Sequence, residues 1–290
     1  MSASLADRLA VLPQYLLPQR LLTRLANRLS NSRSSWIRRP LIGGFRRLFP
    51  VNLAEAANPD PAGYGSFNAF FTRALAADAR PLAEPAHRLI SPCDGTLSQL
   101  GRIRDGQLIQ AKGVDYSAAD LLGCSKWAER FADGHFITIY LAPYDYHRVH
   151  SPMAGRAVEE FRIPGQLFSV STRTSRAVPG LFTRNERMAV LLETEHGPVA
   201  VVMVAALLVA GIETVWDSAG PYRPGSSLRR RPIDKLTVQR GQEIGRFHWG
   251  STVIVLTPAS FPEWIPSLSS GQKIRLGQAL TPAETVRSPE

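Results

Sequence analysis

The middle and C-terminal parts of the chain alternate short apolar runs with turn residues. Apolar runs rich in β-branched residues, bounded by Gly, Pro, Asn or Asp, are typical of buried strands. Such runs occupy residues 107–112, 136–143, 188–194, 199–209, 212–216 and 253–256. Many short strands with turn signals between them predict a mainly antiparallel β domain. We therefore expect an α+β fold in which N-terminal helices lead into this domain.

Two segments outside these runs have helical spacing. Ser66 can cap a helix whose phenylalanines, at positions 67, 70 and 71, share one face. Residues 118–131 also predict a helix, with an interruption at Gly123. Residues 221–232 are polar and basic, which predicts a mobile connecting loop.

The first 30 residues carry a different pattern, with leucines on one helical face and arginines on another. The leucines are at positions 5, 9, 12, 16, 21, 25 and 29, and Arg20, Arg24 and Arg28 form a parallel row. This pattern predicts short amphipathic helices, broken at Pro13 and Pro18. Such helices either lie in the interface of an anionic bilayer or pack on their own domain with a solvated basic face.

Charge favours the bilayer. Residues 1–50 hold nine arginines and one acid, Asp7, and so supply +8 of the chain's net charge of +10. A basic surface favours an anionic partner, and an aromatic-plus-basic motif for nucleic acid is absent from the sequence. No apolar segment reaches the roughly 18 to 20 residues that a spanning helix needs. Arginines also interrupt the N-terminus, unlike a signal peptide. We expect a peripheral protein on the cytoplasmic side of the cell membrane.

Candidate chemistry begins after the run at residues 136–143, in the segment Asp145-Tyr146-His147-Arg148-Val149-His150. Two histidines beside a carboxylate, just past a buried strand, suit proton transfer near neutral pH. A metal half-site or two surface turn residues would explain the same spacing. Neither a Cys nor a His cluster supplies further zinc ligands, so we expect no metal. The two cysteines, Cys93 and Cys124, form no CxxC and indicate buried thiols in a reduced compartment.

The second candidate is Gly250-Ser251-Thr252, immediately before the strand at 253–256. One interpretation is a tight turn with a hydroxyl cap. The other is a serine held against its own preceding carbonyl, because glycine places no Cβ there and tolerates a strained turn.

An ordered set of motifs resembles the family of bacterial phosphatidylserine decarboxylases, which are pyruvoyl-dependent membrane enzymes. The resemblance covers roughly residues 60–280. Its motifs are Phe70-Phe71-Thr72-Arg73, Pro92-Cys93-Asp94-Gly95, Asp145 to His150, Asn185-Glu186-Arg187, Ile212-Glu213-Thr214-Val215-Trp216, Gly241-Gln242-Glu243 and Gly250-Ser251-Thr252.

The resemblance implies a proenzyme that cuts itself. Ser251 would attack the carbonyl of Gly250, with His150 as base and Asp94 as the partner of His150. The products would be a large chain, 1–250, and a small chain, 251–290, which together form a heterodimer; a further dimer of heterodimers is left open. Residue 251 would become a covalent pyruvoyl group.

The mature enzyme would form a Schiff base between that pyruvoyl group and the amine of phosphatidylserine, and release CO2 to give phosphatidylethanolamine. His147 would bind the carboxylate or manage the proton. Residues 1–60 would be the basic membrane-docking helices, and residues 61–290 the catalytic domain.

One departure concerns Trp249, because the family usually has leucine there. An apolar residue is kept, so we expect cleavage at a changed rate. Two other functions compete with this one. A serine hydrolase would use the same Asp94, His150 and Ser251, although a Gly-x-Ser-x-Gly elbow is missing around Ser251. A non-catalytic membrane-binding β domain would need neither histidine.

Overall fold

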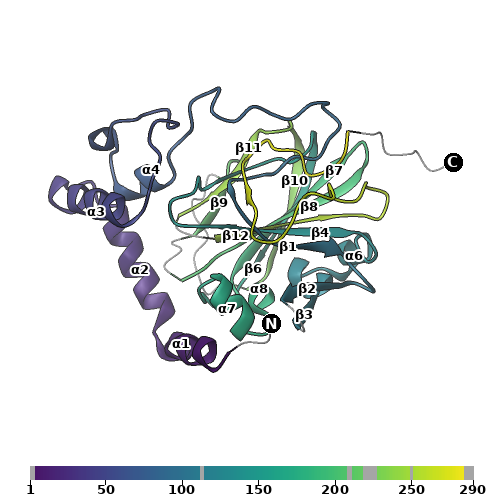
Figure 1. Ribbon diagram of the computed structural model, residues 1–290, viewed down its shortest axis with the longest axis horizontal. Helices are drawn as coiled ribbons and strands as arrows, with labels where there is room; N and C mark the ends of the chain where they lie inside the picture. Colours follow the sequence, from purple (N-terminus) through teal and green to yellow (C-terminus); the bar gives the residue numbers. More distant parts are fainter. Residues whose placement is uncertain (1–3, 112–113, 208–210, 218–226, 249–250, 284–290) are drawn as a thin grey trace.

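The computed structural model describes residues 4–111, 114–207, 211–217, 227–248 and 251–283. Three N-terminal helices pass in succession along one side of a β domain (Figure 1). The strands of both larger sheets pair antiparallel throughout the described ranges. The expected α+β fold is therefore confirmed.

The first helix, α1 (Leu5–Leu16), is capped as its sequence dictates but runs through its proline. Ser4 Oγ accepts from the Asp7 N–H at 3.1 Å, and the Asp7 carboxylate accepts from the Ser4 N–H at 3.2 Å. The predicted break at Pro13 is wrong. Pro13 removes only the hydrogen bond to the carbonyl of Leu9, and Leu9 is exposed, so water can reach that carbonyl.

The predicted break at Pro18 is confirmed, because α2 (Gln19–Ser30) begins immediately after it. This helix buries Thr23 and Ser30 and leaves its leucines, at positions 21, 25 and 29, about half exposed. The small polar side chains therefore face the protein, and the leucine face points outward.

A small aromatic core joins α3 (Ser35–Leu48) to the short α4 (Phe67–Phe71), with the 3-10 turn Pro61–Gly63 between them. The predicted cap is present, since Ser66 Oγ accepts from the Ala69 N–H at 3.0 Å. The core consists of Ile42, Phe45, Leu53, Ala56, Tyr64, Phe67, Phe70 and Phe71. It extends across the predicted domain boundary near residue 60.

The main sheet has eight strands in the order β10-β6-β7-β8-β12-β4-β1-β13. Their bounds are β1 (Gly95–Arg102), β4 (His135–Leu141), β6 (Gly155–Ile163), β7 (Arg187–Thr194), β8 (Gly197–Val204), β10 (Arg229–Val238), β12 (Ser251–Thr257) and β13 (Lys273–Ile274). Every residue of β12 is buried, as its apolar sequence requires for a central strand covered on both faces.

The edge strand β10 corrects one prediction. Residues 229–232 do not belong to a loop, because Arg229 pairs with Arg162 and Pro232 with Glu159 in the ladder with β6. Arginines and a proline are typical of an edge strand, where they discourage pairing with other chains. The remainder of the predicted loop lies largely outside the described residues.

Smaller elements complete the domain. A three-stranded sheet contains β5 (Arg148–His150), β11 (Glu243–Phe247) and β9 (Ile212–Thr214), and a hairpin contains β2 (Gln107–Ala111) and β3 (Val114–Ser117). The short helices are α5 (Ala118–Leu122), α6 (Ser125–Glu129), α7 (Thr172–Ala177) and α8 (Leu181–Arg184). Gly123 interrupts the helix predicted over 118–131, with a φ of 66° that favours glycine. The run predicted as a strand over 199–209 ends as β8 at Val204, and residues 208–210 lie outside the described ranges.

Candidate active site

The sheet order brings the predicted site residues to one end of the main sheet. β4 lies between β12 and β1 and is antiparallel to both. Ser251 therefore starts β12 opposite Leu141, at the end of β4, and Asp94 directly precedes β1 at the same end. The chain that leaves β4 there carries both histidines. The backbones approach closely, because a Cβ on Gly95 would lie 2.5 Å from the Tyr140 carbonyl oxygen.

Ser251 is completely buried, and its hydroxyl has no hydrogen-bond partner among the described residues. A buried polar group without a partner costs about 1–3 kcal/mol in stability. Such a group in a native protein therefore points to a structural or chemical role. Thr252 Oγ1, the next hydroxyl, is also unpaired. The predicted cleavage partner Gly250 and the departure at Trp249 both lie outside the described residues.

His147 is an isolated neutral base. Its Nδ1 donates to the Asp145 carbonyl at 2.8 Å, and its ring lies 4.1 Å from that of Phe71. Since a carbonyl only accepts, Nδ1 holds the proton and Nε2 keeps a free lone pair. Nε2 is buried without a partner in the described part of the chain. Complete burial lowers the pKa of His147 to about 3, so the imidazole is neutral at physiological pH.

His150 has both ring nitrogens engaged. Nδ1 donates to the Gly241 carbonyl at 2.8 Å, and Nε2 accepts from the Tyr146 hydroxyl at 3.0 Å. Burial lowers the pKa of His150 as well. Sequence reasoning missed Tyr146 and Gly241 as partners of this histidine, although both lie in motifs that it singled out.

Asp94 is held by an arginine. Arg80 Nε donates to its Oδ1 at 3.0 Å and Arg80 Nη2 to its Oδ2 at 2.6 Å. The Leu276 N–H adds a third hydrogen bond at 2.9 Å. Within the described residues, no hydrogen bond joins Asp94, His150 and Ser251. The sheet gathers these three at one end without forming a hydrogen-bonded triad.

The segment that leads into Ser251 is tied to the histidine segment. β11 pairs with β5, and the Phe247 N–H donates to the His147 carbonyl at 3.0 Å. Asn68 Nδ2 donates a hydrogen bond to Nδ1 of the next residue, His248, at 2.6 Å. The Nε2 of His248 lies 3.2 Å from Glu213 Oε2. Phe247 and His248, the last described residues before the predicted cleavage site, are therefore held by contacts from several segments of the chain. Sequence reasoning missed this role of Asn68 and Glu213, because both are distant in the chain.

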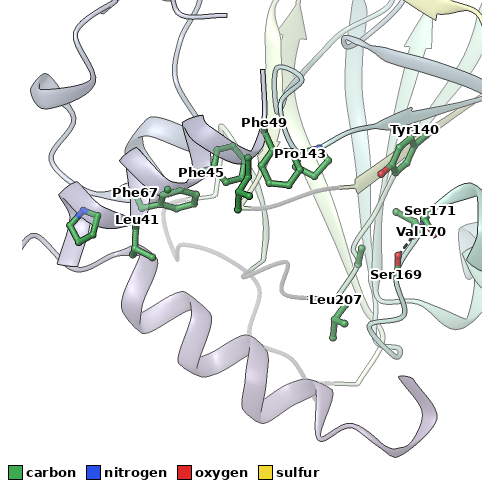
Figure 2. Close-up of a pocket in the computed structure, with 14 residues that line it drawn as sticks. Leu41, Phe45, Phe49, Phe67, Tyr140, Pro143, Ser169, Val170, Ser171 and Leu207 are labelled. Carbon is green, nitrogen blue, oxygen red and sulfur yellow. Dashed lines mark hydrogen bonds between the residues drawn. The ribbon is translucent and has the colours of Figure 1, made fainter. Parts of the chain in front are cut away.

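Two cavities adjoin this sheet end. An apolar cavity of about 580 Å³ lies between α3 and the β domain, and Figure 2 shows residues of both parts facing it. Its lining includes Phe45 and Phe49 from the helical side and Tyr140, Pro143 and Leu207 from the other. A second, polar cavity of about 250 Å³ is lined by Asp94 and Tyr146 among others. One end of the sheet thus offers an apolar and a charged compartment.

In the Asn185-Glu186-Arg187 motif, the side chains of Asn185 and Arg187 hold neighbouring backbone segments together. Asn185 Nδ2 donates to the carbonyls of Phe168 and Ala205, each at 2.8 Å. Arg187 donates through all three guanidinium nitrogens to four backbone carbonyls, those of Asp120, Leu121, Thr183 and Asn185. Glu186, by contrast, is buried with Oε2 unpaired among the described residues.

Glu186→Gln should stabilise the protein at alkaline pH. Burial, only partly offset by Arg20, raises the pKa of Glu186 from 4.5 to about 8. The folded state thus binds one proton more than the unfolded state between pH 4.5 and 8, so its stability falls as pH rises through this range. At pH 9 the Gln variant should gain about 1–3 kcal/mol in free energy of unfolding, and at pH 4.5 almost nothing.

Denaturant titrations of wild type and variant across this pH range measure the difference. The matched control is Glu129→Gln, which removes an exposed carboxylate and should leave the pH profile unchanged. Equal stability of the Glu186→Gln variant and wild type at pH 9 would show that this carboxylate is solvated.

The fold places a buried serine, whose hydroxyl has no partner among the described residues, at the start of a central strand, at the same sheet end as two buried histidines. Comparison with known families identifies which enzyme class this is. The family model for phosphatidylserine decarboxylase matches residues 67–281, and a model described as PSD matches residues 9–50. This chain belongs to the phosphatidylserine decarboxylase family.

Individual relatives cover almost the whole chain. The phosphatidylserine decarboxylase proenzyme of Acidovorax ebreus (strain TPSY) is 47% identical over 279 residues, which is 95% of this chain and 98% of the relative. The proenzyme of Azotobacter vinelandii (strain DJ) is 47% identical over 281 residues, 94% of this chain and 98% of the relative. That of Verminephrobacter eiseniae (strain EF01-2) is 48% identical over 281 residues, 94% and 97% respectively. The similarity thus includes the N-terminal helices as well as the β domain.

Proposed function

We propose that this chain is a self-cleaving phosphatidylserine decarboxylase proenzyme, which converts phosphatidylserine to phosphatidylethanolamine and CO2. The observation that carries the proposal is the Ser251 hydroxyl, buried and unpaired beside the segment of His147 and His150. Family membership favours this reaction over a serine hydrolase and over a non-catalytic domain.

Self-cleavage begins at Ser251. Its Oγ attacks the carbonyl carbon of Gly250, the peptide C–N bond breaks, and an ester forms as the proton passes from oxygen to nitrogen. Removal of the Cα proton of residue 251 then expels the Gly250 carboxylate and leaves a dehydroalanine. Water hydrolyses its imine tautomer, which releases ammonia and leaves a pyruvoyl group at the new N-terminus. Each step is redox-neutral, and the only co-reactant is water.

His150 is the proposed base for the first step, with Asp94 supporting it by charge. Nε2 is its basic nitrogen, because Nδ1 already donates to the Gly241 carbonyl. To receive the serine proton directly, Nε2 must exchange its hydrogen bond with Tyr146 for one with Ser251. Arg80 keeps the Asp94 carboxylate in place during this exchange.

The surroundings of residue 251 fit a pyruvoyl group. Oγ leaves with the Gly250 carboxylate, and the Cβ of residue 251 becomes a methyl group. The position is fully buried and the hydroxyl has no hydrogen bond among the described residues, so this change breaks none there. A pyruvoyl group supplies a carbonyl that reacts with the substrate amine and accepts the electrons released as CO2 leaves.

His147 is the proposed proton carrier of the decarboxylation. The carbon that loses CO2 needs one proton in exchange. Since the His147 imidazole is neutral and its Nδ1–H is engaged, Nε2 must first accept a proton, for example from the substrate ammonium, before it can donate one. Its exclusion from solvent keeps this proton from exchanging with bulk water.

The apolar cavity supports a lipid substrate. Its lining is largely hydrocarbon and aromatic, and it lies between the N-terminal helices and Tyr140 on β4 (Figure 2). Acyl chains that enter from the side of α3 would lie beside the strand that pairs with Ser251. Burial of apolar chains here would supply binding energy far from the reacting atoms.

Intact mass of the purified protein under denaturing conditions tests the function. We expect two chains split after Gly250, with the chain 251–290 lighter by one ammonia than simple hydrolysis would give. Release of CO2 from phosphatidylserine by the same sample completes the test. A single uncut chain without decarboxylase activity would overturn the proposal.

The N-terminal helices are proposed to dock the enzyme on an anionic membrane at the cytoplasmic face. Exposed apolar side chains support this, including Leu16 at 84% and Trp36 at 89% exposure. The leucine face of α2 is turned away from the protein, and arginines follow it along the helix. None of the described helices combines the length and apolarity required to cross a bilayer.

Replacing Leu16 and Leu25 together by Gln should weaken binding to vesicles that contain anionic lipid. Each substitution removes the favourable free energy of transferring a leucine side chain into the bilayer interface. We therefore expect a ten- to hundredfold lower partition coefficient. Co-sedimentation with phosphatidylglycerol-containing vesicles measures it. The control is Ile109→Gln with Leu228→Gln, two apolar residues of the β domain that are each about half exposed, as Leu25 is. Equal losses in both double variants would contradict docking through the helices.

A further inference from the structure

Among the charged residues that the structure describes in the polar cavity, Arg73 has no counter-ion of its own. The cavity is lined by residues from the segments before β1, after β4 and around β13, and its charged members are Glu55, Arg73, Arg80, Asp94, Asp145, Lys273 and Arg275. Arg80 pairs with both Asp94 and Glu55, Arg275 lies 3.2 Å from Glu55, and Lys273 lies 3.7 Å from Asp145. Arg73 has no carboxylate within ion-pair distance in the described part of the chain.

Arg73 is also short of hydrogen bonds. Only 5% of the residue is exposed, and Nη2 donates to the Tyr144 carbonyl at 3.1 Å. Nε and Nη1 are buried and have no partner among the described residues. The guanidinium carbon lies 5.8 Å from the centre of the Phe70 ring, which offsets a small part of the charge.

Arg187 provides the internal comparison. It is buried to the same extent, and all three of its guanidinium nitrogens donate to backbone carbonyls. A buried guanidinium in this fold can therefore be satisfied by the protein alone. Burying a cation without such partners costs several kcal/mol, so the unpaired Nε and Nη1 of Arg73 indicate a missing anion. Desolvation lowers the pKa of Arg73, in keeping with an uncompensated charge.

The cavity's position indicates where that anion comes from. Phe49 and Pro143 line the apolar cavity, and their chain neighbours Pro50 and Tyr144 line the polar one, so the two cavities adjoin at both places. An amphiphile with its chains in the first cavity would place its first charged group in the second.

We propose that Arg73 binds the phosphodiester of the phospholipid headgroup. This assignment rests on the proposed function and adds the group that fixes the headgroup in the site. A guanidinium presents two N–H groups in the geometry that phosphate oxygens accept.

The phosphodiester suits Arg73 better than the substrate's carboxylate does. The carboxylate loses its charge as CO2 leaves, so a cation bound to it would stabilise the ground state and slow the reaction. The phosphodiester is a monoanion in substrate, transition state and product alike. An ion pair with it holds the lipid equally in all three and leaves kcat unchanged.

Arg73→Gln and Arg73→Lys test the assignment, with Arg104→Gln as a matched control at an exposed arginine of the β1–β2 connection. Intact mass first establishes that each variant is cleaved. Decarboxylation in mixed micelles then gives kcat and KM for phosphatidylserine, together with the inhibition constant of phosphatidylethanolamine. The product keeps the phosphodiester and lacks the carboxylate, so its inhibition distinguishes the two anions.

For Arg73→Gln we expect normal cleavage, a KM raised about ten- to a hundredfold, kcat within a fewfold of wild type, and product inhibition weakened by the same factor as KM. Arg73→Lys, which keeps the charge and loses the fork, should lie between wild type and Gln. Should the Gln variant remain uncut, the Lys variant carries the same comparison.

Three results would overturn the assignment. Unchanged KM and product inhibition would show that no anion binds at Arg73. A raised KM with unchanged product inhibition would assign the anion to the carboxylate. Failure of both variants to be cleaved would make Arg73 a structural residue. Failure of the proposed function is separate, because wild type itself would then show neither cleavage nor CO2 release.

Discussion

Ser251→Ala should remain a single chain of 290 residues and should release no CO2 from phosphatidylserine above the assay background. The variant lacks the oxygen that attacks Gly250, so neither the ester nor the carbonyl group at residue 251 can form. The fold should tolerate the change, because the hydroxyl is buried without a partner in the described residues and its removal leaves no group unsatisfied there. We expect the free energy of unfolding to stay within about 1 kcal/mol of wild type or to rise.

Intact mass and thermal unfolding of this variant are measured beside Thr257→Ala. Thr257 lies at the other end of β12 and is also buried, and its hydroxyl has no partner in the part of the chain that the structure describes. It therefore reports the cost of the same deletion away from the site. That control should be cleaved and active. Two fragments from Ser251→Ala would exclude Ser251 as the nucleophile.

Separate alanine substitutions of His147 and His150 should affect different steps, self-cleavage for His150 and decarboxylation for His147. His150→Ala removes the proposed base for Ser251, so the rate of self-cleavage should fall by about 10²–10⁴. His147→Ala removes the buried neutral imidazole that we propose as the proton carrier of decarboxylation. Its chain should still be cleaved, and kcat should fall by about 10²–10⁴.

A time course of cleavage after rapid synthesis, followed by kcat for the cleaved fraction, measures both effects. His196→Ala is the matched control, since His196 lies in the turn between β7 and β8, away from this sheet end. The reverse result, with cleavage lost in His147→Ala alone, would make the free Nε2 of His147 the base. Tyr146→Phe adds a further comparison, because it frees His150 Nε2 without altering either ring.

The elements that the sequence predicted well are those in which local pattern and burial agree. The β-branched run at 253–256 became the buried centre of β12, and Ser66 capped α4 as its position indicated. The two errors come from tertiary context. Pro13 is tolerated inside α1 because its lost hydrogen bond faces water, and residues 229–232 form a strand because β6 supplies a partner edge.

The candidate site divides in the same way. The sequence could name Asp94, His147, His150 and Ser251, and the sheet order explains why they meet at one end. It could not assign their partners, because these come from distant parts of the chain. Arg80 takes both oxygens of Asp94, and Gly241 orients His150 in place of a carboxylate. Which partner each of these side chains takes depends on which backbone segment approaches it most closely. The hydrophobic pattern of the sequence does not determine that.

The central position of β12 has a consequence for the cleaved protein. The strand lies between β4 and β8 and is paired with both, and the cut would fall immediately before its first residue. The fragment 251–290 would then supply an interior strand that the rest of the sheet cannot replace. Cleavage would act as a nick within one folding unit, and the two fragments should unfold together in a single transition. A fragment lost from the sheet would leave two unpaired inner edges, so the two chains of the cleaved protein, once separated by denaturant, should recover activity only when they refold together.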